Sequence, residues 1–140
     1  MIRYTDDLTG VTAERLTGFF EEWGTRPTPA THLRSLHGAE VAILAIDADT
    51  DGVVGFVTAI GDGVLSAYVS LLDVVPGYRG RGIGTELMRR VLSRIGGRYM
   101  IDLTCDDDLV PFYERIGMTP GRAMMLRDPG SLIAAKEDDR

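Results

Sequence analysis

Hydrophobic and polar positions follow two rhythms along the chain, and each rhythm indicates a different kind of element. Over residues 12–23 the apolar positions recur three and four residues apart, as on one face of a helix. A second helix is predicted over residues 29–37, ending at Gly38. A third, over residues 82–95, carries apolar residues at strict four-residue spacing before a pair of glycines. The spacing therefore predicts three helices in the first hundred residues.

The middle of the chain is rich in β-branched residues, and turns containing glycine interrupt it. Strands are predicted over residues 41–46, 53–60 and 64–75. The connections between them are too short for crossovers, so the three strands should form an antiparallel meander. The other predicted elements are strands over residues 2–5, 99–105 and 123–127 and a short helix over residues 109–116.

This order of elements predicts an α+β domain. A right-handed crossover through the helix over residues 82–95 places the following strand parallel beside the long third strand. A chain of 140 residues is close to the usual size of one domain, and we expect residues 1–140 to form a single one. The tail from Asp128 is expected to be loose, because its charged end offers little surface to bury.

Composition places the chain among soluble globular proteins, with 44% hydrophobic and 26% charged residues. No apolar run approaches the roughly 18 residues that a membrane-spanning helix needs. The N-terminus turns polar at once and has no signal-peptide core. A lone cysteine, Cys105, cannot form an internal disulfide, which fits a cytoplasmic location.

The net charge of −6 argues against nucleic acid as a partner, because such proteins present a basic footprint to phosphates. The charge is uneven, however: residues 76–98 hold six arginines and one acid, whereas residues 99–117 are mostly acidic. A basic island in an acidic protein favours a compact anionic ligand. For the arginines at 89, 90, 94 and 98 we prefer a solvated helix face, which leaves Arg79 and Arg81 for a ligand.

Three glycines stand at alternate positions where the long strand ends and the third helix begins. Gly80, Gly82 and Gly84 lack a Cβ, so backbone N–H groups can approach a ligand, and the helix N-terminus favours an anion. The spacing fits neither a dinucleotide fingerprint, which needs glycine in place of Thr85, nor a P-loop, because Ile83 follows Gly82. The alternative interpretation is an ordinary flexible turn.

The segment Arg79-x-x-Gly82-x-Gly84, between a strand ending Val-x-Pro and an amphipathic helix, resembles the Gln/Arg-x-x-Gly-x-Gly/Ala motif of GNAT acetyltransferases. A second segment, residues 111–118, resembles the family's Phe-Tyr-Glu-x-x-Gly-Phe sequence. The resemblance is carried by residues 69–118, whereas the first forty residues match only in general layout. It implies the GNAT acyl-CoA N-acyltransferase fold, a mixed and mostly antiparallel twisted sheet flanked by helices.

The resemblance also implies acetyl-CoA as cosubstrate, without a metal. Arg79 would add charge or orient the loop, and a bulge or splay of the long strand would let its backbone pair with the pantetheine arm. The backbone expected there belongs to Leu72, Asp73 and Val74. The residues expected to hold the pyrophosphate are Gly80, Arg81, Gly82, Ile83, Gly84 and Thr85.

Tyr113 matches the family's tyrosine that protonates the departing thiolate; its alternative role is a core aromatic, which suits Phe112 better.

Positions 66, 68, 70 and 72 share one face of the long strand, so Tyr68 and Ser70 are expected to line the substrate groove. Neither is a convincing base, and a chain of waters is preferred. Asp73 competes as the base, although we favour an exposed aspartate at the strand end.

Two neighbouring residues depart from expectation. Asp106 stands where the family often has an asparagine that hydrogen-bonds the cofactor, and an ionised aspartate cannot donate. Cys105 could be a nucleophile, but we prefer a small packed hydrophobe.

His32 and His37 are expected at or near the end of the second helix, where positive charge is favourable. No spacing suggests a metal site.

The predicted function is transfer of the acetyl group of acetyl-CoA to a primary amine on a small molecule, peptide or protein lysine, by direct attack in a ternary complex. The alternatives are a non-catalytic CoA-binding regulatory or toxin-neutralising module, and transfer of a longer acyl chain. No membrane partner is expected. An exposed final strand with Met124, Met125 and Leu126 favours a homodimer.

Overall fold

The computed structural model describes residues 1–132, and at its centre lies a five-stranded sheet in the order β1-β2-β3-β4-β5. Strands β1 to β4 pair antiparallel with their neighbours, whereas β5 runs parallel to β4. The predicted meander and the parallel placement of the later strand are both confirmed, and so is the α+β class. The strands are β1 (Ile2–Thr5), β2 (Val41–Asp47), β3 (Gly52–Gly61), β4 (Ser66–Val74) and β5 (Met100–Asp102).

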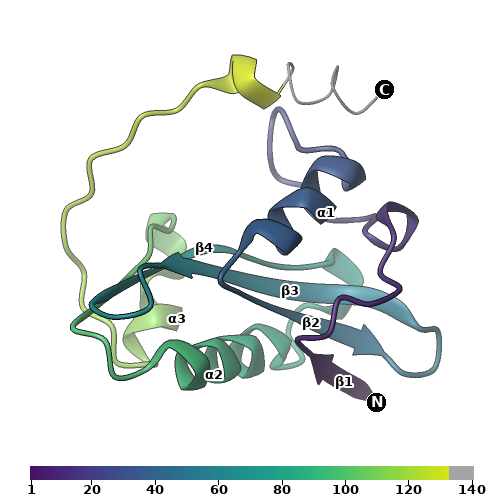
Figure 1. Cartoon of the computed structure of the whole chain (residues 1–140), viewed down its shortest axis with the longest axis horizontal. Helices are drawn as coiled ribbons and strands as arrows, with labels where there is room; N and C mark the ends of the chain where they lie inside the picture. Colours follow the sequence, from purple (N-terminus) through teal and green to yellow (C-terminus); the bar gives the residue numbers. More distant parts are fainter. Residues whose placement is uncertain (133–140) are drawn as a thin grey trace.

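Helices cover both faces of this sheet (Figure 1). Helix α1 and the chain before it lie on one face, and α2 lies across the other. The helices are α1 (Pro29–Gly38), α2 (Ile83–Ile95) and α3 (Val110–Glu114), with 3-10 turns at η1 (Ala13–Arg15), η2 (Pro76–Tyr78) and η3 (Asp107–Leu109). The predicted bounds of α1 and α2 hold to within one residue. At α1 the Thr28 side chain caps the first turn and proline follows it.

Strand β2 shows how one apolar run serves two cores. Its odd-numbered residues from Val41 pack toward α2, and its even-numbered residues from Ala42 pack toward α1. Both faces are buried, so the strand reads as a continuous apolar stretch. Gly55 on β3 allows α2 to approach closely, since a Cβ there would lie 3.2 Å from side-chain atoms of Ile83 and Leu87.

The helix predicted over residues 12–23 is wrong. Only η1 is helical there, and Gly18 and Phe20 take positive φ angles of 88° and 62°. The apolar residues that suggested the helix are mostly buried, but an irregular backbone places them on the sheet. Gly18 crosses close to Val75, because a Cβ on Gly18 would meet the Val75 side chain at 3.3 Å. Helical spacing of buried residues was therefore a misleading signal.

The final strand predicted over residues 123–127 does not form, and the chain runs there without pairing to residues 1–132 (Figure 1). Strand β5, predicted over residues 99–105, keeps only three residues. Strand β4 and helix α3 are also shorter than predicted. The expected loose tail from Asp128 falls mostly on residues 133–140, outside the described part of the chain.

A bulge interrupts β4 at Ser70. Leu71 pairs with Thr58 and Val69 with Ala59, so Ser70 is an extra residue between them. A one-residue slip reverses the side-chain alternation that follows it. Leu72 therefore packs with the α2 core, and the prediction that it shares a face with Tyr68 is wrong.

Candidate cofactor and acceptor site

The edge of β4 is open beyond its first three residues. Strand β5 pairs with β4 only from Ser66 to Tyr68, so within residues 1–132 the later part of β4 has β3 as its sole strand neighbour. The bulge at Ser70 lies where the two parallel strands part. The predicted interruption of the strand is present, but it begins at Ser70, ahead of Leu72. Such an edge leaves backbone groups for an added extended ligand.

The glycine loop runs from this strand end into α2. Gly80 and Gly82 take φ angles of 78° and 80°, and Gly82 is the N-cap of the helix. The first N–H groups of a helix have no partner inside it, and they face the end where the dipole is positive. A Cβ on either glycine would have no heavy atom within 4 Å, so the space beside the loop is open. The loop can thus receive a phosphate against its backbone.

Arg79 anchors the glycine loop through contacts with neighbouring segments. Its Nε donates to the Val74 carbonyl at 2.8 Å, and its terminal nitrogens reach the carboxylates of Glu22 and Asp73. These contacts tie the loop to the end of β4 and to the segment before α1. Of the two roles considered for Arg79, they favour orientation of the loop over direct contact with phosphate.

Arg81 is placed differently from the other arginines of the basic island. Its guanidinium lies 4.9 Å from the centre of the Tyr78 ring and donates to the Gly77 carbonyl at 3.3 Å, with no carboxylate partner in residues 1–132. It is therefore the available cation beside the loop. The other arginines are ion-paired: Arg89 and Arg90 with Glu86, Arg94 with Asp6, and Arg98 with Glu40. The first three lie on the solvated face that was predicted, but Arg98 does not, because its side chain is only 11% exposed and also donates to the Ser66 carbonyl.

Tyr113 stands on α3, partly buried against the α2 core with Phe112. The two rings meet edge to face with centres 4.9 Å apart. Burial, followed by the nearby Cys105, raises the pKa of the Tyr113 phenol to about 12. Like an ordinary tyrosine, this side chain keeps its proton at neutral pH and can therefore donate it. Phe112 also lies beside the loop, since a Cβ on Gly84 would meet it at 3.8 Å.

Tyr68 and Ser70 are hydrogen-bonded within the protein. The Tyr68 hydroxyl lies 2.7 Å from the Thr104 hydroxyl, which links β4 to the chain after β5. The Ser70 hydroxyl lies 2.8 Å from that of Thr58 and also donates to the Thr58 carbonyl at 3.3 Å. Both side chains are half-buried. They can line a groove, but neither has a basic partner that would make it a base.

Asp73 is not the exposed strand-end aspartate that we favoured. Its side chain is 18% exposed, and one carboxylate oxygen accepts a hydrogen bond from the Phe20 N–H at 2.8 Å. Burial raises its pKa, against the lowering effects of that bond and of Arg79. The carboxylate fixes the backbone of Phe20, so the contacts of Asp73 indicate a structural role.

Cys105 does not have the environment of a nucleophile. Cys105 is exposed, so the expected small packed hydrophobe is wrong. Desolvation and then the aspartates at 106, 107 and 108 raise the pKa of its thiol, which disfavours the reactive thiolate. Asp106 precedes the 3-10 turn η3, where its carbonyl accepts from the Leu109 N–H at 3.0 Å.

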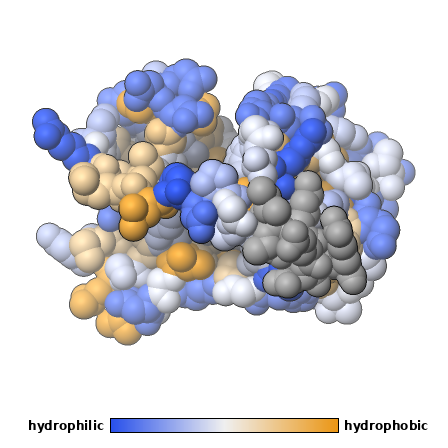
Figure 2. Space-filling view, turned by 90° about the horizontal axis from the view of Figure 1, so that it is seen from above, coloured by the Kyte–Doolittle hydropathy of each residue, from blue (hydrophilic) through white to orange (hydrophobic). Residues whose placement is uncertain are grey.

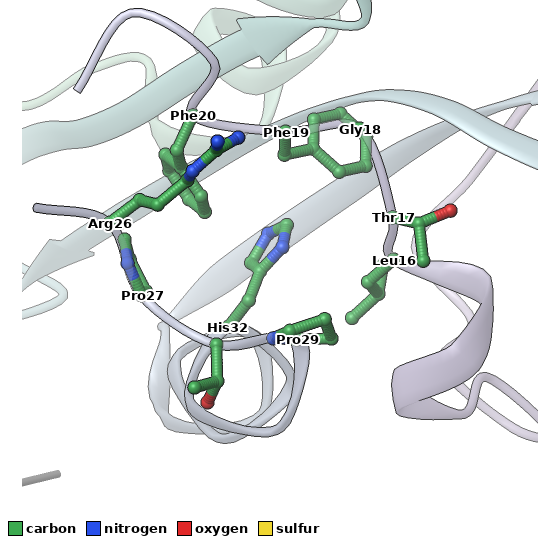
Figure 3. Close-up of a pocket in the computed structure, with 10 residues that line it drawn as sticks. Leu16, Thr17, Gly18, Phe19, Phe20, Arg26, Pro27, Pro29 and His32 are labelled. Atoms are coloured by element: carbon green, nitrogen blue, oxygen red, sulfur yellow. The ribbon is translucent and has the colours of Figure 1, made fainter. Parts of the chain in front are cut away.

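A pocket of about 300 Å³ lies between residues 16–20 and the start of α1 (Figure 3). His32 projects into it from α1, is only 2% exposed, and neither ring nitrogen has a hydrogen-bond partner in residues 1–132. The prediction that His32 lies near the helix end is wrong, whereas His37 is in the last turn. Sequence reasoning missed the pocket. The available signal was that His32 stands four residues before buried Leu36, on the same helix face.

The free energy of unfolding is expected to fall as the pH drops through the titration range of His32. Burial lowers its pKa from 6.5 to about 4, so between these values the unfolded chain binds more protons than the folded one. Stability from this source is complete above pH 6.5 and is lost toward pH 4. The full difference is about 3 kcal/mol. Arg26 is the charged group that lines the same pocket.

Urea unfolding at pH 7 and pH 4.5 measures this dependence. His32→Phe should lose stability less steeply on acidification than the parent chain, and His37→Asn, at an exposed position, should match the parent. An unchanged pH dependence in His32→Phe would show that this imidazole is not the group responsible.

No three His, Cys, Asp or Glu side chains in residues 1–132 lie together in a way that could hold a metal ion. No helix in the same part of the chain is both long and apolar enough to cross a membrane.

Comparison with known proteins agrees with this geometry. Residues 8–118 match the family model described as the acetyltransferase (GNAT) family. A crystal structure from Deinococcus radiodurans R1, assigned to the acetyltransferases, is 50% identical, with a TM-score of 0.88 over 92% of this chain and 90% of that one. A GNAT family acetyltransferase from Streptococcus pneumoniae TIGR4 is 26% identical, with a TM-score of 0.69 over 91% and 98% of the two chains. Glucosamine-6-phosphate N-acetyltransferase from Arabidopsis thaliana, 14% identical with a TM-score of 0.65, covers 91% of this chain and 98% of its own, and shares the fold.

Proposed function

The chain belongs to the GNAT acetyltransferase family and is an acyltransferase, and from this premise we propose that it acetylates a primary amine by direct attack on acetyl-CoA in a ternary complex. The family uses acetyl-CoA as its cosubstrate. The single observation that best supports the proposal is the pair of left-handed glycines, Gly80 and Gly82, that opens α2 beside the free edge of β4.

The residues of the loop fit the pyrophosphate of acetyl-CoA. Backbone N–H groups from Gly80 to Thr85 would bind its oxygens, with Arg81 supplying the nearby positive charge. The backbone of residues 72–74 would pair with the pantetheine arm, although the Val74 carbonyl already accepts from Arg79. Leu72 and Asp73 are therefore the better candidates for that pairing.

The transfer itself breaks one bond and forms another. The amine nitrogen attacks the thioester carbon, the C–S bond breaks, and the thiolate takes the proton of the Tyr113 phenol. The proton lost by the amine leaves through water, and the phenolate is reprotonated from solvent. A lysine-like amine has a pKa of about 10.4 and must first be deprotonated, which we assign to water near Tyr68 and Ser70.

The second candidate is a CoA-binding module without turnover, and the presence of Tyr113 where the family has its acid favours the enzyme. Intact-mass measurement after incubation with acetyl-CoA separates the acceptor classes. A small-molecule acceptor leaves the mass of the protein unchanged and adds one acetyl group to the amine. Acetylation of an added protein supports a lysine acceptor. Acetyl-CoA that binds while no acceptor is modified would favour the module.

We further propose that residues 1–140 form one catalytic domain that pairs as a homodimer through residues 123–127. Met124, Met125 and Leu126 are 98%, 58% and 99% exposed, and β5 has an open edge in the described part of the chain. The face seen in Figure 2 carries hydrophobic areas among polar ones. An extended apolar segment and an unpaired strand edge suit each other across two copies.

Leu126→Asp is expected to convert the dimer to a monomer, because it places a charge on the paired segment. Since Leu126 is almost fully exposed, the monomer should keep its stability. Sedimentation analysis at several concentrations measures the change. Ser131→Asp adds the same charge beyond the segment and should leave the dimer intact. A parent chain that is monomeric at every concentration would contradict the proposal.

A further inference from the structure

His32 is a buried polar group whose ring packs against that of Phe56, with centres 4.3 Å apart, while its two nitrogens have no partner in residues 1–132. A neutral imidazole carries one donor and one acceptor nitrogen, and neither is satisfied by residues 1–132. Each such group left unpaired costs about 1–3 kcal/mol. The ring stands in the pocket, surrounded by the labelled side chains of Figure 3. An imidazole in this position is suited to a ligand that enters the pocket.

The backbone of Phe20, which lines the same pocket as His32, is strained. Phe20 takes a φ of 62°, a left-handed conformation that costs a bulky residue about 1–3 kcal/mol. The hydrogen bond from its N–H to Asp73, at 2.8 Å, fixes this conformation. Strain of this kind is concentrated at binding sites, where the surrounding structure maintains it.

The walls define the chemistry of an occupant. The rings of Phe19 and Phe20 stand edge to face with His32, at 5.2 and 4.9 Å between centres. A volume of about 300 Å³ has room for an aromatic ring with short substituents or for a branched alkyl group. Arg26 lines the pocket and pairs with Glu21 at 3.3 Å, so its charge is already matched. An uncharged apolar group is favoured, with one polar atom for His32.

A hydroxyl satisfies His32 best, because it can both donate and accept and so pairs with either tautomer of the ring. A carboxylate could only accept, and an ammonium could only donate. Both would also lose their hydration among the phenylalanine rings.

The pocket is connected to the strand that borders the cofactor site. Asp73 joins Phe20 on the pocket wall to Arg79 at the glycine loop. Side-chain alternation before the bulge places Tyr68 and Ser70 on the same face of the sheet as the pocket, opposite α2. An acceptor that reached the thioester across this face could extend into the pocket.

We propose that the pocket beside His32 binds the far end of the acceptor, an apolar group bearing a hydroxyl and linked to the reacting primary amine. This assignment rests on the proposed acetyl transfer, whereas the pocket's affinity for a hydroxylated ring does not. The two parts can therefore be tested separately.

Phenol tests the pocket without catalysis. With ¹⁵N-labelled histidine, added phenol should shift the ring-nitrogen signals of His32 and leave those of exposed His37 unchanged. Toluene, which lacks the hydroxyl, should bind at least about fivefold more weakly, since one hydrogen bond contributes about 1 kcal/mol. His32→Phe should abolish the preference for phenol. Phenol that leaves the His32 signals unmoved, or binds His32→Phe equally well, overturns the proposal.

Two amines test the acceptor assignment. Tyramine and phenethylamine differ only by a hydroxyl, and kcat/KM for tyramine should exceed that for phenethylamine by about tenfold in the parent chain, the effect of one well-placed hydrogen bond. His32→Phe should remove this difference, chiefly through KM, and His37→Phe should keep it. Equal rates for both amines, unaffected by His32→Phe, overturn the acceptor assignment. Absence of thiol release with every amine would instead overturn the proposed function, and phenol binding would still decide the pocket.

Discussion

Replacing Tyr113 with phenylalanine is expected to lower kcat for acetyl transfer by about 100- to 10,000-fold, the usual contribution of a positioned general acid. Burial raises the pKa of the phenol to about 12, so this side chain carries its proton at neutral pH. The change removes only the hydroxyl and keeps the ring that packs against Phe112 and the α2 core. Affinity for acetyl-CoA and the free energy of unfolding should therefore stay close to those of the parent chain.

Steady-state kinetics, with acetyl-CoA affinity measured by calorimetry, separates the chemical step from binding. Tyr99→Phe is the matched control, because Tyr99 is 86% exposed and loses the same atom. It should retain full activity. If Tyr113→Phe keeps kcat within about threefold of the parent value, another group protonates the thiolate.

Gly82→Ala is expected to weaken acetyl-CoA binding by about 10- to 100-fold. A methyl group would stand where the backbone N–H groups must approach the pyrophosphate, and each charged hydrogen bond lost contributes about 1.5–3 kcal/mol. The φ of 80° also strains alanine by about 1–2 kcal/mol, so stability falls as well. Calorimetric titration with CoA measures the affinity.

Gly63→Ala distinguishes the two effects. Gly63 has a φ of 77°, and a Cβ there also meets no heavy atom within 4 Å, but it lies in the turn between β3 and β4. It should lose about the same stability as Gly82→Ala while binding acetyl-CoA normally. Equal affinities in the two variants would mean that the loop around Gly82 does not hold the cofactor.

The parts of the fold that are bounded by capping or turn residues could be predicted from the sequence. Helix α1 is bounded by its Thr28 cap and Gly38, and the meander follows from the short turns between its strands. The glycine loop could be placed because glycine was needed at 80 and 82, where φ is positive. In these cases one or two residues determine the backbone, so a single sequence carries the information.

Features that depend on distant contacts could not be predicted. The family resemblance predicted an interruption of β4, but no local residue marks its position at Ser70, which moves Leu72 to the other face. In residues 12–23 the apolar side chains that cover the sheet happen to fall at helical spacing. Gly18 was the one local sign against a helix there, and it takes a positive φ. The roles of Asp73 and His32 follow from partners on other elements, such as Phe20.

Thiol release from acetyl-CoA in the presence of a panel of primary amines tests the proposed acetyl transfer directly. We expect amine-dependent release of CoA, with one acetyl group gained by the amine for each thiol formed. Binding of acetyl-CoA without release for any amine would contradict the proposed transfer and favour a CoA-binding module. Failure of acetyl-CoA to bind at all would contradict the assignment of the loop at Gly80 and Gly82.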